Sequence, residues 1–286
     1  MIIAIASGKG GTGKTTVATS LALSLASDHP ILFLDCDVEA PNAHLLLEPS
    51  LEQHGEATLL IPQIDESLCN QCGICSEVCQ YNAIVMAGEK VLVFPELCHG
   101  CGSCFLNCPT NAITEVPNVL GKLDDGHTPE GIRFAQGVLD IGQPFAVPVI
   151  KQLKSSFPAR PEETVIIDAP PGTSCPVVET IHDTDYVLLV TEPTPFGLHD
   201  LMLAYDLTRE LNLPVGVIIN RDGIGDHKVD DFCEEQGIPV LLRIPMQREI
   251  AAGLAQGIPL ITLKPEYRQQ LRKLFVTVSN SVKSKL

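Results

Sequence analysis

The sequence predicts an α/β fold in which helices flank a mostly parallel sheet, with a small α+β domain inserted into it. Two observations carry this prediction. Short apolar runs alternate with segments of helical periodicity at both ends of the 286-residue chain, as in parallel sheets whose strands are joined by helices. Between about residues 62 and 118 this alternation stops, and two cysteine-rich units replace it.

The first elements surround a glycine-rich loop. Ile2 to Ala6 is expected to be a strand, and Thr15 to Leu25 a helix that ends before Pro30. A second apolar run, Ile31 to Leu34, leads into the acidic stretch Asp35-Cys36-Asp37. These carboxylates therefore follow the carboxyl end of a strand, where ligands bind in doubly wound sheets.

The remaining elements follow the cysteine-rich units. Strands are expected over Ile132 to Ile141, Val165 to Ile167, Val187 to Val190 and Val215 to Ile219, and helices over Leu198 to Leu211, Lys228 to Gln236 and from Glu266 to the end. The larger domain is therefore expected to be discontinuous. Residues 1–61 and 119–286 form it, and residues 62–118 are inserted at a loop.

Composition narrows the class of protein. No stretch approaches the roughly 20 apolar residues of a membrane span, and the apolar start MIIAIA lacks the basic flank of a signal peptide, so a cytoplasmic protein is expected. The formal net charge is -16, without a block of lysine or arginine, which disfavours nucleic acid as a partner. An acidic surface suits a basic or redox partner.

The loop GKGGTGKTT, residues 8–16, contains the phosphate-binding pattern G-x-x-x-x-G-K-[ST] between a strand and a helix. Its backbone amides can point into one concavity, to which the helix adds its positive end. Lys14 would contact the β and γ phosphates, Thr15 would ligate Mg²⁺, and Thr16 would contact the α phosphate. The residues expected to bind the nucleotide from this loop are Gly10, Gly11, Thr12, Gly13, Lys14, Thr15 and Thr16.

Lys9 is surplus to that pattern. With it included, KGGTGKT resembles the deviant phosphate loop of the MinD/ParA/Mrp ATPases, the family that also holds the nitrogenase iron protein. Other motifs agree: LDCD at 34–37, VIIDAPPG at 165–172, TEPT at 191–194, IIN at 218–220 and IPMQREI at 244–250. The resemblance covers nearly all of the chain outside the cysteine-rich units.

The resemblance implies roles for single residues. In that family the additional lysine reaches across a face-to-face dimer to the nucleotide of the other subunit. Lys9 is therefore expected to act in trans, in an ATP-dependent homodimer or in a heterodimer with a related ATPase. Asp37 matches the aspartate that orients the attacking water, and Asp168 matches the one that holds Mg²⁺ through a water. Asp35 is expected to be structural.

The resemblance also implies which base is bound. Asn220 matches the asparagine that reads adenine. A guanine reader of the N-K-x-D type would need an acid at position 223, where this chain has Gly223. ATP is therefore expected rather than GTP.

The two cysteine-rich units read CNQCGICSEVC and CHGCGSCFLNCP, and each continues to an N-A-I triplet. Both match the bacterial ferredoxin run CxxCxxCxxxC, whose fourth cysteine ligates the other cluster. Two [4Fe-4S] clusters are expected, one held by Cys69, Cys72, Cys75 and Cys108, the other by Cys98, Cys101, Cys104 and Cys79. A pair of structural zinc sites is the alternative, although zinc does not need this interlocked spacing. Clusters in such a module usually carry electrons, but some only brace a fold.

Three cysteines lie outside these runs. Cys36 and Cys233 are expected to be buried as small hydrophobic side chains. Cys175 follows Asp168 by seven positions, on the segment expected to move with the nucleotide state. A further bridging cluster and a packed or redox-sensitive thiol are the two alternatives for it.

The leading functional hypothesis is an ATPase whose nucleotide cycle gates electron transfer through the clusters, or supports maturation of a metalloprotein, with a redox or metalloprotein partner. The alternative is a MinD-like positioning or partner-recruiting ATPase in which the clusters are structural. A plain ferredoxin with a degenerate nucleotide fold is disfavoured, because Lys14, Thr15, Asp37 and Asp168 are all intact.

Membrane attachment is not expected, since the apolar stripe of the last helix is typical of a helix that packs on a sheet. That stripe comprises Leu271, Leu274, Phe275, Val278 and Val282.

Overall fold

The computed structural model describes residues 1–284. Its core is a nine-stranded sheet with the strand order β11-β10-β9-β1-β8-β2-β7-β6-β3, in which all neighbours from β11 to β7 are parallel. The strands of the parallel part are β1 (Ile2–Ala6), β2 (Ile31–Asp35), β7 (Arg133–Leu139), β8 (Thr164–Asp168), β9 (Tyr186–Thr191), β10 (Val215–Asp222) and β11 (Val240–Pro245). The expected mostly parallel sheet is confirmed.

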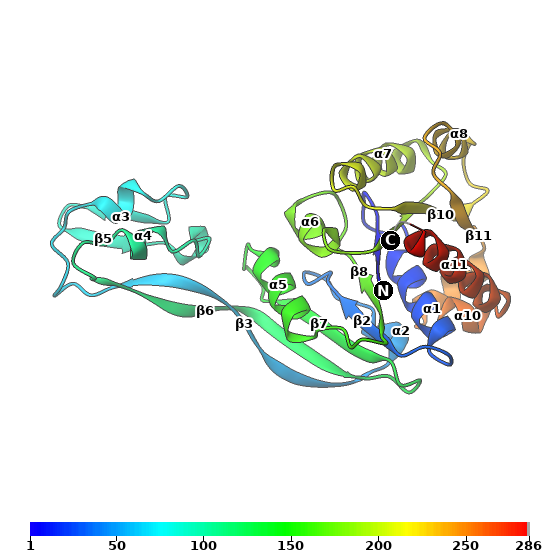
Figure 1. Cartoon of the computed structure of the whole chain (residues 1–286), viewed down its shortest axis with the longest axis horizontal. Coiled ribbons are helices and arrows are strands. Elements are labelled where there is room, and N and C mark those ends of the chain that lie inside the picture. The colour runs from blue at the N-terminus through cyan, green and yellow to red at the C-terminus, as the bar shows by residue number, and fades with distance from the viewer. Residues whose placement is uncertain (285–286) are drawn as a thin grey trace.

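Helices cover both faces of this sheet (Figure 1). One face carries α1 (Lys14–Leu25), α2 (His44–Leu47), α9 (Arg248–Ala255), α10 (Leu260–Leu263) and α11 (Glu266–Lys283), and the other carries α5 (Ala146–Ser156), α6 (Cys175–Ile181), α7 (Pro195–Glu210) and α8 (Lys228–Glu235). In β1 the residues alternate between these layers: Ile3 and Ile5 pack in one apolar cluster, and Ala4 and Ala6 in the other. A period of two in a strand buried on both faces produces this division.

The last helix is part of the body. Leu271, Leu274, Phe275 and Val278 of α11 are buried in the same apolar cluster as Val17 of α1. The apolar stripe is thus covered by the sheet and by α1, as expected. Within residues 1–284, no helix combines the length and the apolar character needed to cross a bilayer.

A long antiparallel ribbon extends the sheet beyond β7. It consists of β3 (Ser50–Ile64) and β6 (Ile113–His127), which pair from Ser50 opposite His127 to Ile64 opposite Ile113. Residues 121–127 of β6 also pair with β7, so one half of the ribbon belongs to the sheet, and the other half projects away from it (Figure 1). The boundaries expected at residues 62 and 118 lie within these two strands.

The cysteine-rich units lie at the far end of this ribbon (Figure 1). They contain α3 (Ile74–Glu77), the hairpin of β4 (Ile84–Ala87) and β5 (Lys90–Val93), a 3-10 turn at Pro95–Leu97 and α4 (Ser103–Leu106). The units repeat each other in backbone conformation. Gly73 and Gly102 precede the two short helices with φ of 78° and 71°, and Asn82 and Asn111 of the N-A-I triplets have φ of 53° and 54°. The internal repeat seen in the sequence is therefore also a structural repeat.

Candidate functional site

The glycine-rich loop joins β1 to α1 and is held in place from β10. Gly11 and Gly13 have φ of 77° and 96°, in the left-handed region that glycine adopts at low cost. A Cβ atom at Gly13 would collide with the amide of Asn220, which donates a 2.7 Å hydrogen bond to the carbonyl of Thr12. Asn220 therefore fixes the loop. Its expected contact with adenine stays a prediction.

A cavity of about 420 Å³ opens at the carboxyl ends of the strands, within the size range of ligand sites. Its lining brings together Gly10, Gly11, Gly13, Lys14, Thr15, Thr16, Asp37, Asn220, Arg221 and the segment from Pro245 to Leu254. The loop and Asp37, remote in sequence, are thus adjacent in space. Met246, Gln247 and Ile250 add an apolar and amide wall whose role sequence reasoning did not assign, although their motif was recognised.

Thr15 lines this cavity and contacts Asp168 at the end of β8. The Thr15 hydroxyl donates a 2.6 Å hydrogen bond to Asp168 Oδ2. The other oxygen, Oδ1, is buried and has no hydrogen-bond partner in residues 1–284. A hydroxyl beside a carboxylate with a free buried oxygen suits Mg²⁺, which prefers oxygen ligands and retains several waters. These two residues therefore fit the expected metal.

The charges around Lys14 explain why a cation would be stabilised there. Burial, together with the neighbouring Asp35, raises the pKa of Asp168 well above its usual value, although the Thr15 hydrogen bond and Lys14 oppose the shift. Burial also lowers the pKa of Lys14, against the attraction of Asp168, Asp37 and Asp35. Three carboxyl groups thus share one lysine, and a bound divalent cation would supply the missing positive charge.

The two acids of LDCD have different surroundings. Asp35 is fully buried and accepts hydrogen bonds from the backbone N–H groups of Asp37 (3.2 Å), Asn42 (3.0 Å) and Ala43 (3.0 Å). Burial raises the pKa of Asp35 to about 7. Asp37 instead lines the cavity, and burial raises its pKa while Lys14 lowers it. The geometry thus supports a structural role for Asp35 and access to the nucleotide for Asp37.

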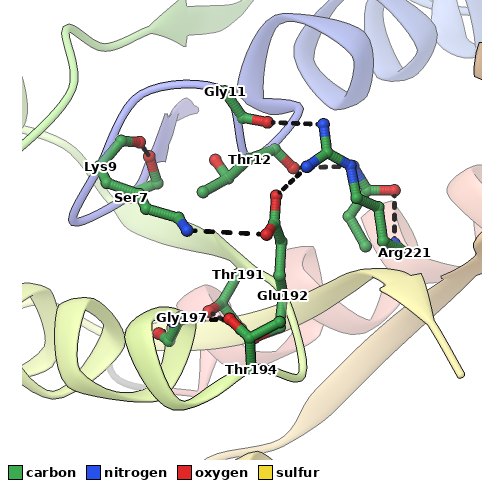
Figure 2. Close-up of polar contacts among 10 residues, drawn as sticks. Ser7, Lys9, Gly11, Thr12, Thr191, Glu192, Thr194, Gly197 and Arg221 are labelled. Carbon is green, nitrogen blue, oxygen red and sulfur yellow. Dashed lines mark hydrogen bonds and ion pairs between the residues drawn. The ribbon is translucent and has the colours of Figure 1, made fainter. Parts of the chain in front are cut away.

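Lys9 is not part of the cavity lining, and its side chain points toward Glu192, just after the end of β9 (Figure 2). Its Nζ lies 3.6 Å from Oε2 of Glu192, the acid of the TEPT motif. Oε1 of Glu192 accepts a 2.5 Å hydrogen bond from Arg221 Nη1, and Arg221 Nη2 donates to the carbonyl of Gly11 at 3.1 Å. Neither Glu192 nor Arg221 was identified from the sequence. The only signal was the position of TEPT after a buried strand.

The eight cysteines of the two units line two small cavities. Cys69, Cys72, Cys75 and Cys108 line one, and Cys79, Cys98, Cys101 and Cys104 line the other. Each cavity thus receives three cysteines from one unit and the fourth from the other, the grouping expected from the ferredoxin run. Within the described residues, no three His, Cys, Asp or Glu side chains converge tightly enough to hold a single metal ion. Four cysteines around each cavity is the number of thiolate ligands that a [4Fe-4S] cluster takes.

The thiols of the cavities differ in how readily they ionise. Burial raises the pKa of Cys104 to about 11 and also raises the pKa of Cys75 and of Cys98. The Ser103 hydroxyl lowers the pKa of Cys101. Burial acts to raise the pKa of Cys108, but backbone N–H groups, including that of Ala112 at 3.3 Å from its sulfur, outweigh burial and lower it. Such N–H donors would stabilise negative charge on a bound cluster.

Of the three cysteines outside the two units, two are buried and one is exposed. Cys36 and Cys233 are buried, as expected, and burial raises the pKa of Cys233 to about 11. Cys175 is exposed at the start of α6, so it is not a packed thiol, whereas a redox-sensitive thiol and a bridging cluster stay predictions for it. It lines a further cavity, of about 710 Å³, together with Phe145 of the body and His99 of the second cysteine unit.

A phosphate loop between β1 and α1, with acids at the ends of neighbouring parallel strands, defines a P-loop nucleotide-binding domain. The chain belongs to the CobQ/CobB/MinD/ParA nucleotide-binding family, whose domain model matches residues 3–260. The predicted resemblance to MinD, ParA and Mrp proteins is thereby confirmed at the level of the family.

Relatives include two uncharacterized proteins of Methanocaldococcus jannaschii. One is 32% identical over 230 residues (80% of this chain and 83% of the relative), and the other is 35% identical over 227 residues (79% and 80%). An iron-sulfur cluster carrier protein of the same organism is 24% identical over 300 residues (99% of this chain and 85% of the relative). The solved structure of the septum site-determining protein MinD with Mg-ADP, from Pyrococcus horikoshii OT3, has a TM-score of 0.55 and 23% identity, covering 96% of this chain and 93% of MinD. The last likeness is one of fold.

Proposed function

We propose that the protein is an ATPase that carries two [4Fe-4S] clusters and whose nucleotide-dependent dimer gates electron transfer through them. One observation carries this proposal: two four-cysteine cages stand on a ribbon that is continuous with the sheet holding the nucleotide cavity. The cages exchange their fourth cysteine as two-cluster ferredoxins do. Membership of a nucleotide-binding family supports the part of the proposal that concerns ATP.

At the nucleotide, each residue has a separate task. Lys14 would contact the β and γ phosphates, and Thr15 and Asp168 would hold Mg²⁺, which neutralises phosphate charge when bound. Asp37, at the cavity wall, would orient the attacking water. Lys9 would reach the nucleotide of a second chain. Lys14→Ala should therefore abolish ATP binding, because the cation at the γ phosphate is lost.

In the cysteine module, the protein would hold and insulate the clusters. The thiolates of the eight cysteines would ligate iron, and the clusters would supply one-electron chemistry when bound. Ile64, Met86, Val91 and Ile113 form apolar walls around the first cage. Such walls limit the access of water and thereby tune the reduction potential.

A continuous set of contacts leads from the nucleotide toward the module, beginning at α6. This helix starts seven residues after Asp168. Lys154 of α5 donates to the carbonyls of Glu179 (2.8 Å) and Thr180 (3.3 Å) and pairs with Asp183 (2.6 Å), so it binds the carboxyl end of α6. A cation at this end of a helix is favourable. We expect α5 to follow any displacement of α6.

From α5 the contacts continue to the ribbon and to the second cage. The Gln152 side chain bonds both to the N–H of Thr58 (3.0 Å) and to its carbonyl (2.7 Å), which ties α5 to β3. Phe145, at the start of α5, lies 4.5 Å from the His99 ring, which stacks on Tyr81 at 3.8 Å. His99 follows Cys98, and Tyr81 lies two residues after Cys79. A displacement of α5 would therefore first move the residues next to the second proposed cluster, the one in the cage of Cys79, Cys98, Cys101 and Cys104.

An anaerobic redox titration monitored by electron paramagnetic resonance tests the proposal, with no nucleotide, with ADP and with a non-hydrolysable ATP analogue. A coupling of about 1 to 3 kcal/mol would shift a one-electron potential by tens of millivolts or more. Phe145→Ala should reduce the shift while iron content and ATP binding persist. Phe232→Ala is the matched control, because it removes a Phe–Tyr contact, with Tyr205, in the α7–α8 region. Equal potentials in all three nucleotide states would favour structural clusters and a partner-recruiting ATPase.

A role in metalloprotein maturation is the second candidate, because a relative of 24% identity is named an iron-sulfur cluster carrier protein. Transfer of iron and sulfide from the loaded protein to an apo-ferredoxin, stimulated by ATP, would favour this candidate. The complete four-cysteine shell around each proposed cluster argues for retention rather than release.

A further inference from the structure

The Glu192 carboxylate lies between two cations, and the two contacts are unequal (Figure 2). Its Oε1 accepts a 2.5 Å hydrogen bond from Arg221, whereas its Oε2 lies 3.6 Å from the Lys9 ammonium. The second distance exceeds that of an ordinary N–H···O hydrogen bond. Lys9 is therefore held by charge attraction alone, and Arg221 by attraction and a hydrogen bond.

Arg221 is the fixed member of this group. It follows Asn220 at a β-bulge and has φ of 55°, which is uncommon outside glycine and asparagine. Its N–H donates to Asn220 Oδ1 at 2.9 Å, and its Nη2 donates to the Gly11 carbonyl at 3.1 Å. The strained backbone thus directs the guanidinium onto the phosphate loop, where Glu192 holds it.

Lys9 is the movable member. The Ser7 hydroxyl bonds to the Lys9 carbonyl at 2.5 Å and thereby fixes its backbone, but its side chain is 32% exposed. The Glu192 side chain is 8% exposed, and an unpaired carboxylate at this depth would be costly. Because Arg221 remains on Glu192 when Lys9 leaves, departure of Lys9 leaves no buried charge without a partner. Separating Lys9 from Glu192 therefore costs little free energy.

We propose that Glu192 is a positioning residue that keeps Lys9 on its own chain until ATP brings two chains together, and then releases it to the nucleotide of the second chain. The proposal rests on the function proposed above, in which Lys9 acts in trans. Three phosphates carry more negative charge than one carboxylate that is already paired, so the bound nucleotide competes successfully for the lysine. Without a second chain, Lys9 returns to Glu192.

Sedimentation velocity of the full chain with Mg²⁺ and a non-hydrolysable ATP analogue tests this proposal. Glu192→Gln removes the attraction for Lys9, while its amide oxygen can still accept from Arg221. One exposed or half-exposed ion pair is worth about a two- to fivefold change in an equilibrium constant, and a dimer releases two. The dissociation constant of the dimer should therefore fall by about tenfold. With ADP the variant should stay monomeric.

Two further variants separate the possible causes. Two chains of net charge -16 repel each other, so Glu210→Gln, which removes an exposed acid at the end of α7, controls for net charge and should leave dimerisation nearly unchanged. Glu192→Asp keeps the charge but is too short to reach both cations, so it should also tighten the dimer. An unchanged or weaker dimer in both folded Glu192 variants would overturn the proposal. If Lys9→Ala still dimerised with the ATP analogue, the trans role of Lys9 itself would be refuted.

Discussion

The hydroxyl of Thr15 donates a 2.6 Å hydrogen bond to Asp168, which joins the first turn of α1 to the end of β8 across 153 positions of sequence. This contact brings together the two residues that would hold Mg²⁺, Thr15 directly and Asp168 through a water. It also connects the phosphate loop to the segment that leads into α6, and through α6 to the cysteine module.

Asp168→Asn should sharply reduce Mg²⁺-dependent ATP hydrolysis, by about a hundredfold or more, because one oxygen and the negative charge facing the metal are lost. The melting temperature should not fall, since burial raises the pKa of Asp168 and so disfavours its charged form, and the amide is nearly isosteric. Hydrolysis rates measured across a Mg²⁺ series, with the melting curve alongside, check this. Unaltered hydrolysis at low Mg²⁺ would contradict the assignment.

The neighbouring acids Asp35 and Asp37 should behave in opposite ways. Asp37→Ala should retain ATP affinity but trap an ATP-bound dimer, because loss of the water-orienting carboxylate raises the barrier only in the transition state. Asp35→Asn should instead lower stability by about 1 to 3 kcal/mol, because an amide has one acceptor oxygen for three buried backbone donors. Dimer lifetime with ATP and denaturant midpoints compare the two. Full hydrolysis by Asp37→Ala would refute its role.

Glu163 should contribute stability that depends on pH. Arg133 Nη1 donates to both of its oxygens, at 2.8 and 2.7 Å, and the N–H of Arg160 donates to Oε2 at 2.8 Å. Burial acts to raise the pKa of Glu163, but these bonds outweigh burial and lower it. The contribution is therefore fully present above the ordinary pKa of a glutamate. It is lost as pH falls through that value toward the lower pKa of the folded state.

Glu163→Gln should accordingly lower the melting temperature at pH 7, at a cost of about 1 to 3 kcal/mol, and the difference from wild type should shrink below about pH 4. Melting curves over this pH range test it. Glu162→Gln is the matched control, because its exposed side chain is the neighbour in sequence. A difference that is constant with pH would show that packing, and not the ion pair, is responsible.

The parallel half of the fold could be predicted because each strand there is a short, continuous apolar run, such as Ile31 to Leu34, followed by a loop with recognisable chemistry. The ribbon could not. Ser50–Ile64 includes Gly55 and Pro62, and most of its residues are at least partly exposed, so no apolar alternation marks it as a strand. Its 15 residues are held by pairing with β6, which is a property of two distant segments.

The nucleotide site divides in the same way. The phosphate loop and Asp37 carry local patterns with a chemical meaning, so their convergence on one cavity could be predicted. Glu192 lies in the TEPT motif and Arg221 follows IIN, but neither motif indicates what these two side chains contact. Their roles arise from a 2.5 Å contact between the ends of β9 and β10 and from a positive φ, neither of which composition or spacing reveals. Phe145 and His99 meet for the same kind of reason, through the path of the ribbon.

The exchanged fourth cysteines give the most specific prediction for the module. If Cys108 completes the cage of Cys69, Cys72 and Cys75, Cys108→Ser should affect the cluster of the first unit although Cys108 lies in the second. Cys79→Ser should affect the other cluster. Wild type should hold about eight irons per chain and each variant about four, and the two variants should retain different electron paramagnetic resonance signals.

Cys175→Ser is the matched control, because this exposed cysteine lies outside both cages, and its iron content should equal that of wild type. If instead Cys108→Ser and Cys104→Ser removed the same cluster, and Cys79→Ser and Cys75→Ser the other, each unit would hold its own cluster, and the exchanged arrangement would be wrong.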